Sequence, residues 1–375
     1  MTRFVAGLAA LTLLGACAAP TTSFVSDADI PTDGSGKPDG SKDGGVTDGA
    51  PTDGGGDVVA PPQTKILCGS IFCRADQQCQ NNACVTACTG SKVPGDYATI
   101  QGAVTALATA QMDATICLSG QTYSEAVTAA ASPNKLLTII GTSGTKINSL
   151  SVTGSYSKVT LKAFGVGTVT INGPSPVDAI GIHADTFQAS TAQVGAVLID
   201  GCDLGATAQS YGLYVYRTTT SQPLTVTAQN TWFHGATNGA FVNAVTNSNL
   251  TAIFLNDTFT ASGRGLYSAS TGTITLTYLN SIFSGLTIAG ITLTGGHTLT
   301  HSNNLLFGNA SNYAGTAVDG AGYVKADPLL DTGTPPELKQ GSPARGAADV
   351  AKAPAKDYWA VPRGSSADIG AVEGN

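Results

Sequence analysis

Asp200, Asp203 and Arg217 are the residues of this sequence whose types and spacing could support catalysis. Two carboxyl groups on one turn of a fold can serve a glycoside hydrolase, and a basic residue can abstract the proton in a polysaccharide lyase. Carboxylates are otherwise scarce, because no Glu occurs between Glu125 and Glu337. Asp residues in turns also bond to their own backbone, and the sequence favours that structural role over catalysis. We expect structural roles for three of the histidines, which are His234, His297 and His301.

A second group of residues could bind a carbohydrate. Short strands follow Gly markers, and if the first apolar residue of each strand points inward, the next side chain points outward. Rings repeated about every 4.8 Å along a sheet would stack against sugar rings, while polar neighbours would bind hydroxyl or carboxyl groups. The predicted binding residues are His183, Asp185, Tyr214, Tyr216, Arg217, Phe241, Asn243 and Tyr267. Two alternatives stay open: the C-terminal or Cys-rich segment covers these rings, or the inward and outward faces are exchanged.

An internal repeat must position these residues. Its clearest marker is Asn-x-x-Phe, at intervals of 26, 24 and 24 residues: Asn230 with Phe233, Asn256 with Phe259, Asn280 with Phe283, and Asn304 with Phe307. A Gly followed by an apolar residue repeats with a similar period, and two markers with one period indicate a solenoid. Short alternating strands without a helical pattern indicate a parallel β-helix. We expect the Phe side chains to form an internal aromatic file and the Asn side chains an amide ladder at turns.

Both ends of the repeat region resemble a known family. Residues 96–104 and 115–125 look like the capping helix and first coil of the pectin-lyase-like superfamily, whose members are right-handed parallel β-helix proteins. Segments 327–330, 341–344, 357–363 and 368–373 resemble the C-terminal part of exported bacterial members. The resemblance covers about residues 93–375 and implies a β-helix of roughly eight to ten coils over residues 93–326, followed by a tail over 327–375. The first coil also resembles that of pectin methylesterases, but their downstream motifs are missing, so the resemblance implies a fold and no activity.

Cysteines are concentrated before the repeat, in a predicted small module at residues 63–92. The cysteines expected to form disulfides are Cys68, Cys73, Cys79, Cys84, Cys88 and Cys117. Two bridges within the module would leave one cysteine over, and Cys88 with Cys117 is a plausible third bridge; the spacing does not give the connectivity. A zinc site is the alternative, but paired C-x-x-C spacings are absent. We therefore expect no metal and no cofactor, and Cys202 as a buried thiol.

The N-terminus has the features of an export signal. Met1 to Arg3 precede an apolar run from Phe4 to Leu14, which is too short to span a bilayer, so residues 1–16 are predicted to be a signal peptide. Leu14 to Cys17 resemble a bacterial lipobox, which implies acylation of Cys17 and attachment to a lipid bilayer. Ala18 and Ala19 place no acidic residue after the cysteine, which in lipoproteins implies export to the outer membrane, on its periplasmic or its cell-surface side. Ordinary signal cleavage without acylation of Cys17 is the alternative.

Most of the net charge of −7 belongs to the next segment. Residues 26–62 contain eight Asp and two Lys among many Gly and Pro, which predicts a disordered tether over residues 17–62. A calcium-binding loop is the alternative reading, although the Asp spacing is irregular. The acidic balance argues against nucleic acid as a partner.

The sequence thus predicts an all-β lipoprotein, which we expect to be monomeric. Low charge in the coils favours glycan binding or adhesion without catalysis. A polysaccharide lyase or glycoside hydrolase using Asp200, Asp203 and Arg217 is the alternative, and a purely structural envelope protein is a third class.

Overall fold

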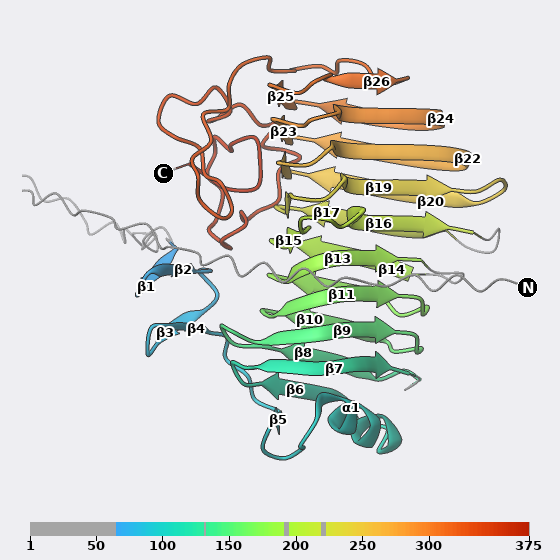
Figure 1. Cartoon of the computed structure of the whole chain (residues 1–375), viewed down its shortest axis with the longest axis vertical. Coiled ribbons are helices and arrows are strands. Elements are labelled where there is room, and N and C mark those ends of the chain that lie inside the picture. The colour runs from blue at the N-terminus through green and yellow to red at the C-terminus, as the bar shows by residue number, and fades with distance from the viewer. Residues whose placement is uncertain (1–64, 131–132, 191–194, 219–222, 375) are drawn as a thin grey trace, which may run out of the picture. The chain divides into compact units, whose positions relative to one another are not determined.

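The computed structural model describes residues 65–130, 133–190, 195–218 and 223–374. The predicted signal peptide, the predicted acylation site Cys17 and the predicted tether lie outside the described residues. Most of the described chain forms a parallel β-helix of about nine turns, which confirms the predicted fold class (Figure 1). Each strand pairs in parallel with the equivalent strands of the turns before and after it, so the turns build three faces.

The three faces are formed by the following strands. Face 1 contains β5 (Ser91–Val93), β6 (Ala114–Leu118), β8 (Leu136–Ile140), β10 (Lys158–Lys162), β12 (Val177–Ile180), β14 (Gly195–Asp200), β17 (Leu224–Gln229), β20 (Asn249–Leu255) and the second halves of β22 (Arg264–Leu279) and β24 (Ala289–Ser302). Face 2 contains the first residues of β7 (Thr122–Ala129), β9 (Lys146–Val152), β11 (Gly165–Ile171) and β13 (His183–Ala189), then β15 (Asp203–Leu204), β18 (Trp232–Phe233), β21 (Thr258–Thr260), β23 (Ile282–Ser284) and β25 (Leu305–Phe307). Face 3 contains the remainder of β7 to β13, then β16 (Tyr211–Arg217), β19 (Asn238–Ala244), the first halves of β22 and β24, and β26 (Tyr313–Gly315).

Apolar side chains of all three faces fill the interior, because alternate residues of each strand point inward. The predicted aromatic file is present on face 2. Phe233, Phe259 and Phe283 are buried, and their rings stack with centroids 4.5 and 4.6 Å apart. This stacking follows from parallel pairing in register, which places equivalent side chains directly above one another.

The prediction that Phe307 continues this file is wrong. Leu306 pairs with Phe283 and occupies the inward position, whereas Phe307 is 38% exposed. The last full turn is one residue shorter than the marker suggests, because Asn303 and not Asn304 adopts the left-handed corner conformation, with φ of 50°. Asn304 still joins two turns, since its amide nitrogen donates to the Tyr278 carbonyl.

The asparagine ladder lies at the corner between faces 1 and 2. Asn230, Asn256 and Asn280 have φ of 51°, 52° and 54°, a left-handed conformation that Asn tolerates better than most residues. Asn280 Nδ2 donates to Asn256 Oδ1 at 3.2 Å, as a ladder requires. These amides also hold the C-terminal segment, because Asn256 Nδ2 donates to the Asp368 carbonyl at 2.8 Å. The repeat therefore supplies both the turn and a docking edge.

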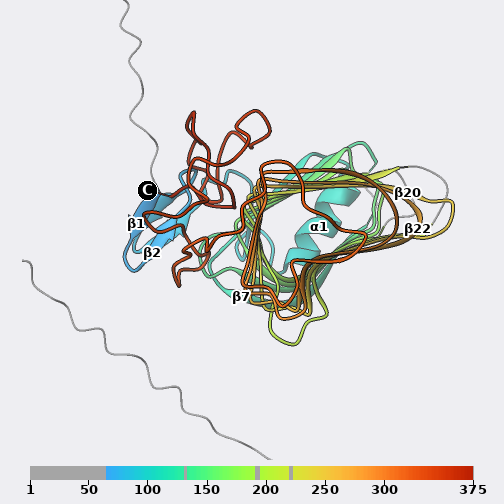
Figure 2. The same cartoon turned by 90° about the horizontal axis from the view of Figure 1, so that it is seen from above.

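A helix closes the first turn, as predicted. In Figure 2, which views the turns from above, α1 (Ile100–Thr109) lies within their outline. Thr99 caps the helix by accepting from the Gly102 amide, and the Glu125 carboxylate accepts from two further amides of the first helical turn at 3.0 Å each. Within the described ranges, no helix is long and apolar enough to cross a membrane.

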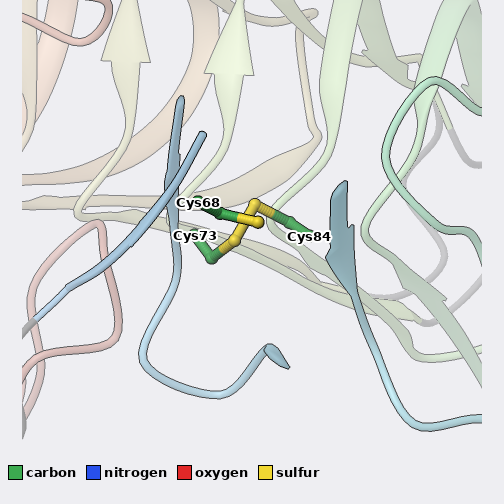
Figure 3. Close-up of side chains that lie close together, drawn as sticks. All are labelled: Cys68, Cys73 and Cys84. Carbon is green, nitrogen blue, oxygen red and sulfur yellow. A yellow bond between two sulfur atoms is a disulfide. The ribbon is translucent and has the colours of Figure 1, made fainter. Parts of the chain in front are cut away.

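The Cys-rich module consists of two small antiparallel hairpins, β1 (Ile66–Cys68) with β2 (Ile71–Cys73) and β3 (Gln78–Gln80) with β4 (Ala83–Val85). Its disulfides are Cys68–Cys79 and Cys73–Cys84, and Cys88–Cys117 ties it to the first turns, as predicted. Figure 3 shows Cys68, Cys73 and Cys84 close together, with ligand atoms within 4.8 Å of one another. All three sulfurs are in disulfides, so they are not thiolate ligands for a metal ion in this state.

The C-terminal segment, residues 327–374, packs beside the Cys-rich module on the same side of the β-helix (Figures 1 and 2). Arg74 of the module joins all three parts. Its Nη1 donates to the Tyr358 carbonyl of the C-terminal segment at 2.6 Å and to the Gly201 carbonyl of the β-helix at 3.1 Å. Cys202, next to this joint, is a buried free thiol, and burial raises its pKa to about 12.

Candidate functional site

A patch of five aromatic side chains lies on three consecutive turns of face 3. Strand register places Tyr214, Phe241 and Tyr267 directly above one another, as the sequence predicts. Tyr216 and Asn243 form the neighbouring outward file, which is also as predicted. We call the rings on β16, β19 and β22 the aromatic patch: Tyr211, Tyr214, Tyr216, Phe241 and Tyr267. Tyr211 was not predicted, because it precedes its Gly marker instead of following it.

The rings of the aromatic patch stack on one another. The Tyr214 and Phe241 rings are 5.7 Å apart and tilted by only 14°, and Tyr211 stacks on Phe241 at 5.2 Å. The Arg264 guanidinium lies over the Tyr267 ring at 5.1 Å. The expectation that open ring faces receive sugar rings is therefore wrong for the stacked rings, because a parallel file turns the faces toward each other.

Ring edges and hydroxyl groups provide the accessible surface of the aromatic patch. Phe241 is only 9% exposed, whereas the four tyrosines are half-buried. Among the described residues, none of the four tyrosine hydroxyls has a hydrogen-bond partner, so all remain available to a ligand. Partial burial raises the pKa of Tyr214, which keeps its phenol protonated and able to donate. The patch thus combines apolar ring edges with a row of hydrogen-bonding groups.

His183 and Asp185 do not belong to this patch, contrary to the prediction. Gln188 pairs with Tyr214, whereas His183 pairs with Gly165 and with Asp203 on face 2. The reason is that β13 runs continuously across faces 2 and 3, while the next turn is interrupted by a loop between β15 and β16. Residues that follow their Gly markers by the same number of positions therefore do not always lie above one another in the β-helix.

Arg217 cannot contact a surface ligand, so its predicted binding role is also wrong. It lies on the inward side of β16 with 0% exposure and pairs with Ala244. Arg217 continues the alternation of inward residues along β16. The sequence pattern instead predicts that Arg217 lies at the end of the strand and is accessible. Removal from water lowers the pKa of Arg217.

The three weak catalytic candidates are not brought together. Asp200, at the end of β14 on face 1, accepts a hydrogen bond from Asn230 Nδ2 at 2.9 Å. Asp203 lies on face 2, and Arg217 is buried behind face 3. Arg217 therefore does not share an accessible surface with the two carboxylates, and both carboxylates accept hydrogen bonds from side chains of neighbouring turns.

Asp203 instead joins two histidines from neighbouring turns. His183 Nδ1 lies 2.6 Å from one carboxylate oxygen and His234 Nε2 lies 2.5 Å from the other. The hydrogen bond with Asp203 raises the pKa of His183. Burial alone would raise the pKa of Asp203, but the bonds from both imidazoles hold it below its usual value. The sequence did not predict this cluster, because the turns differ in length and the spacing of the residues does not indicate which side chains lie above one another. His234, for which the sequence indicated no partner, is bonded to Asp203.

No protein-family model, curated protein or solved structure matches this chain. The function of the candidate site is therefore inferred from the geometry of its residues. Two features of that geometry bear on function: an accessible aromatic patch on face 3 and a carboxylate held by two histidines on face 2.

Proposed function

We propose that this protein binds glycans without catalysis and that the aromatic patch is the contact surface. The main observation in support is the group of five rings on three turns. The four tyrosine hydroxyls of this group have no hydrogen-bond partner among the described residues. Accessible apolar patches on soluble domains commonly mark interaction sites. A glycan presents both C–H groups and hydroxyls, which match the ring edges and phenols of this surface.

The charge around the patch favours a neutral ligand. Asn243 and Gln188 are the half-buried polar neighbours in the outward files, and neither carries a charge. Arg264 is engaged with Tyr267 and donates to Asn238 Oδ1 at 3.4 Å. A nucleic acid or acidic protein would need an accessible cationic surface, which this patch does not offer.

The proposal includes a membrane anchor and an exported location. The lipobox-like sequence ending at Cys17 and the acidic segment after it support an acylated protein tethered to the bacterial outer membrane. Three disulfides support an oxidising compartment. The end segments support membership of the pectin-lyase-like superfamily, with the enzyme alternative weakened because Asp200, Asp203 and Arg217 do not converge.

The test is retention on immobilised polysaccharides, using the full chain with Cys17→Ser to prevent acylation. The double variant Tyr214→Ala with Tyr267→Ala should lose retention at least tenfold, because it removes two hydroxyls and opens the stack. Phe307→Ala removes an exposed ring from face 2 and is the matched control. Unchanged retention of the double variant contradicts the proposal, and released oligosaccharides would show an enzyme instead.

A further inference from the structure

Strand β11 leaves a gap in an outward file of side chains on face 2. In this file Lys146, Gly165 and His183 are successive partners on three turns. Gly165 has no side chain, so the side chains of Lys146 and His183 face each other across two strand spacings, or roughly 10 Å.

A second glycine widens the gap. Gly167 lies two residues further along β11, on the same side of the strand. A Cβ built on it would lie 2.5 Å from the Asn148 carbonyl and 3.9 Å from Asp185 Oδ2, so Asn148 and Asp185 border it on either side. We call the resulting gap the glycine notch, and its bordering side chains are Lys146, Asn148, His183 and Asp185.

The two glycines differ in what the backbone requires. At Gly167 the close Asn148 carbonyl excludes any side chain, so glycine is a structural necessity. At Gly165 a Cβ would meet nothing closer than 3.4 Å, and its backbone lies outside the left-handed region. The backbone therefore requires glycine at position 167. At Gly165, the first residue of β11, a side chain would fit, so its absence leaves open space on the outer surface of the strand.

The polar groups bordering the notch are free to bind. Among the described residues, the Lys146 ammonium, the Asn148 amide and the Asp185 carboxylate have no hydrogen-bond or ion-pair partner. These three residues line a cleft of about 450 Å³, together with Thr122 and Ser124 among others.

His183 borders the gap at the Gly165 end, where these two residues line a second cleft together with Phe164 and Tyr358 among others. Its Nδ1 is engaged by Asp203, an ionised carboxylate that can only accept, so the ring is fixed with Nε2 as the remaining nitrogen. The side chain is 52% exposed, so this nitrogen can reach a ligand.

We propose that the glycine notch binds one sugar unit of a neutral glycan through its hydroxyl groups. Lys146 supplies donors, the Asp185 carboxylate and Nε2 of the neutral His183 ring supply acceptors, and Asn148 supplies both. The charges of Lys146 and Asp185 offset each other, which selects a neutral ligand over a uronate. This inference rests on the proposed function only in taking a glycan as the ligand. The site itself is separate, because the glycine notch lies on β9 to β13 and the aromatic patch lies on later turns.

The experiment fills the notch without disturbing the fold. Gly165→Thr in the Cys17→Ser chain adds a strand-favouring side chain where there is room for it. Gly296→Thr is the matched control, because a Cβ there meets nothing within 4 Å on a distant turn. The probes are glucose, galactose and N-acetylglucosamine and their neutral β-linked tetramers, measured by calorimetry and by NMR of the His183 ring. Gly165→Thr should weaken tetramer binding at least tenfold and abolish the sugar-induced shift of the His183 signals, whereas Gly296→Thr should do neither.

The outcomes separate this site from the aromatic patch. If Gly165→Thr and Asp185→Asn both bind the tetramers like the parent chain while Tyr214→Ala with Tyr267→Ala does not, the notch is overturned and the proposed function stands. If His183 signals shift with a sugar but the tyrosine variants bind normally, the notch stands and the patch does not. Absence of any shift with every probe overturns the notch, whatever the polysaccharide retention shows.

Discussion

Replacing Asp203 with asparagine tests whether the carboxylate holds three turns together. Asp203→Asn preserves the size of the side chain but removes the charge that receives His183 from one turn and His234 from another. An asparagine offers one acceptor oxygen and an NH2 group that can only donate, so at least one imidazole can no longer donate to this side chain, and neither can form a charge-assisted bond with it. We expect lower stability with little change in the fold.

The expected loss is about 2 kcal/mol. A hydrogen bond to a charged group contributes about 1.5–3 kcal/mol when it is shielded from water. The His234 side chain is 21% exposed, so its bond belongs at the lower end of that range, or about 1.5 kcal/mol. The His183 side chain is 52% exposed, so solvent screening reduces its share to about 0.5 kcal/mol. For a chain of this size the sum corresponds to a melting temperature lowered by about 4 °C.

The loss depends on pH in a direction that the pKa shifts determine. The raised pKa of His183 means that its contribution is complete below its ordinary value of 6.5 and disappears as pH rises through the folded-state pKa. The lowered pKa of Asp203 means that its contribution is present above 3.8 and disappears as pH falls through the folded-state pKa. Asp203→Asn should therefore be most destabilising between pH 3.8 and 6.5 and less so in alkaline solution.

Thermal unfolding of the parent and variant at about pH 5 and about pH 9 measures this difference. Asp319→Asn is the control, because Asp319 forms an exposed pair with Lys325 and should cost under about 1 kcal/mol. NMR titration should also show the pKa of His183 falling in the Asp203→Asn chain. Equal losses at both pH values, or an unchanged His183 titration, would refute the reasoning.

Two further predictions concern the core and the C-terminal segment. Phe259→Leu removes a ring stacked at 4.5 and 4.6 Å between two others and should cost about 2 kcal/mol in urea unfolding, whereas Phe307→Leu should cost under about 0.5 kcal/mol. A similar loss in both would argue against the aromatic file. Burial, aided by Asp368 and opposed by Arg363, raises the pKa of Glu373 from 4.5 to about 7, so stability should fall as pH rises across that interval. Glu373→Gln should remove this dependence and raise stability at about pH 8 by on the order of 1 kcal/mol, a value discounted for partial solvation; a persistent slope would assign the titration to another group.

The fold was predictable because its information is periodic. Asn256 and Phe259, like Asn280 and Phe283, repeat at a spacing that parallel pairing converts directly into stacking, so the corner and the file follow from counting residues. The same reasoning failed at Phe307, where one residue fewer in a turn moved the ring to the outside. Because side chains alternate between the two sides of a strand, a shift of one residue exchanges the inward and the outward positions.

The candidate site was only partly predictable, because it depends on loops between strands. Tyr214, Phe241 and Tyr267 were placed correctly, since β16, β19 and β22 begin in the same way. His183 was misplaced because its turn lacks the loop that separates β15 from β16 in the next one. Its pairing with Asp203 joins residues from turns of different length, for which no local pattern exists.

The hydrogen bonds of Arg74 with the β-helix and the C-terminal segment affect the order in which the chain can complete its structure. The β-helix can wind turn by turn as the polypeptide is synthesised, because each turn needs only its predecessor. The Cys-rich module is made first, yet its Arg74 binds Tyr358, which lies 284 residues later. Docking of the module is therefore completed only when the C-terminal segment has been made. A chain cut short before that segment would keep the contacts of the module with the β-helix, which include the Cys88–Cys117 disulfide, the Asp76–Lys162 ion pair and the bond from Arg74 to Gly201. It would lack the contacts with Tyr358 and Trp359.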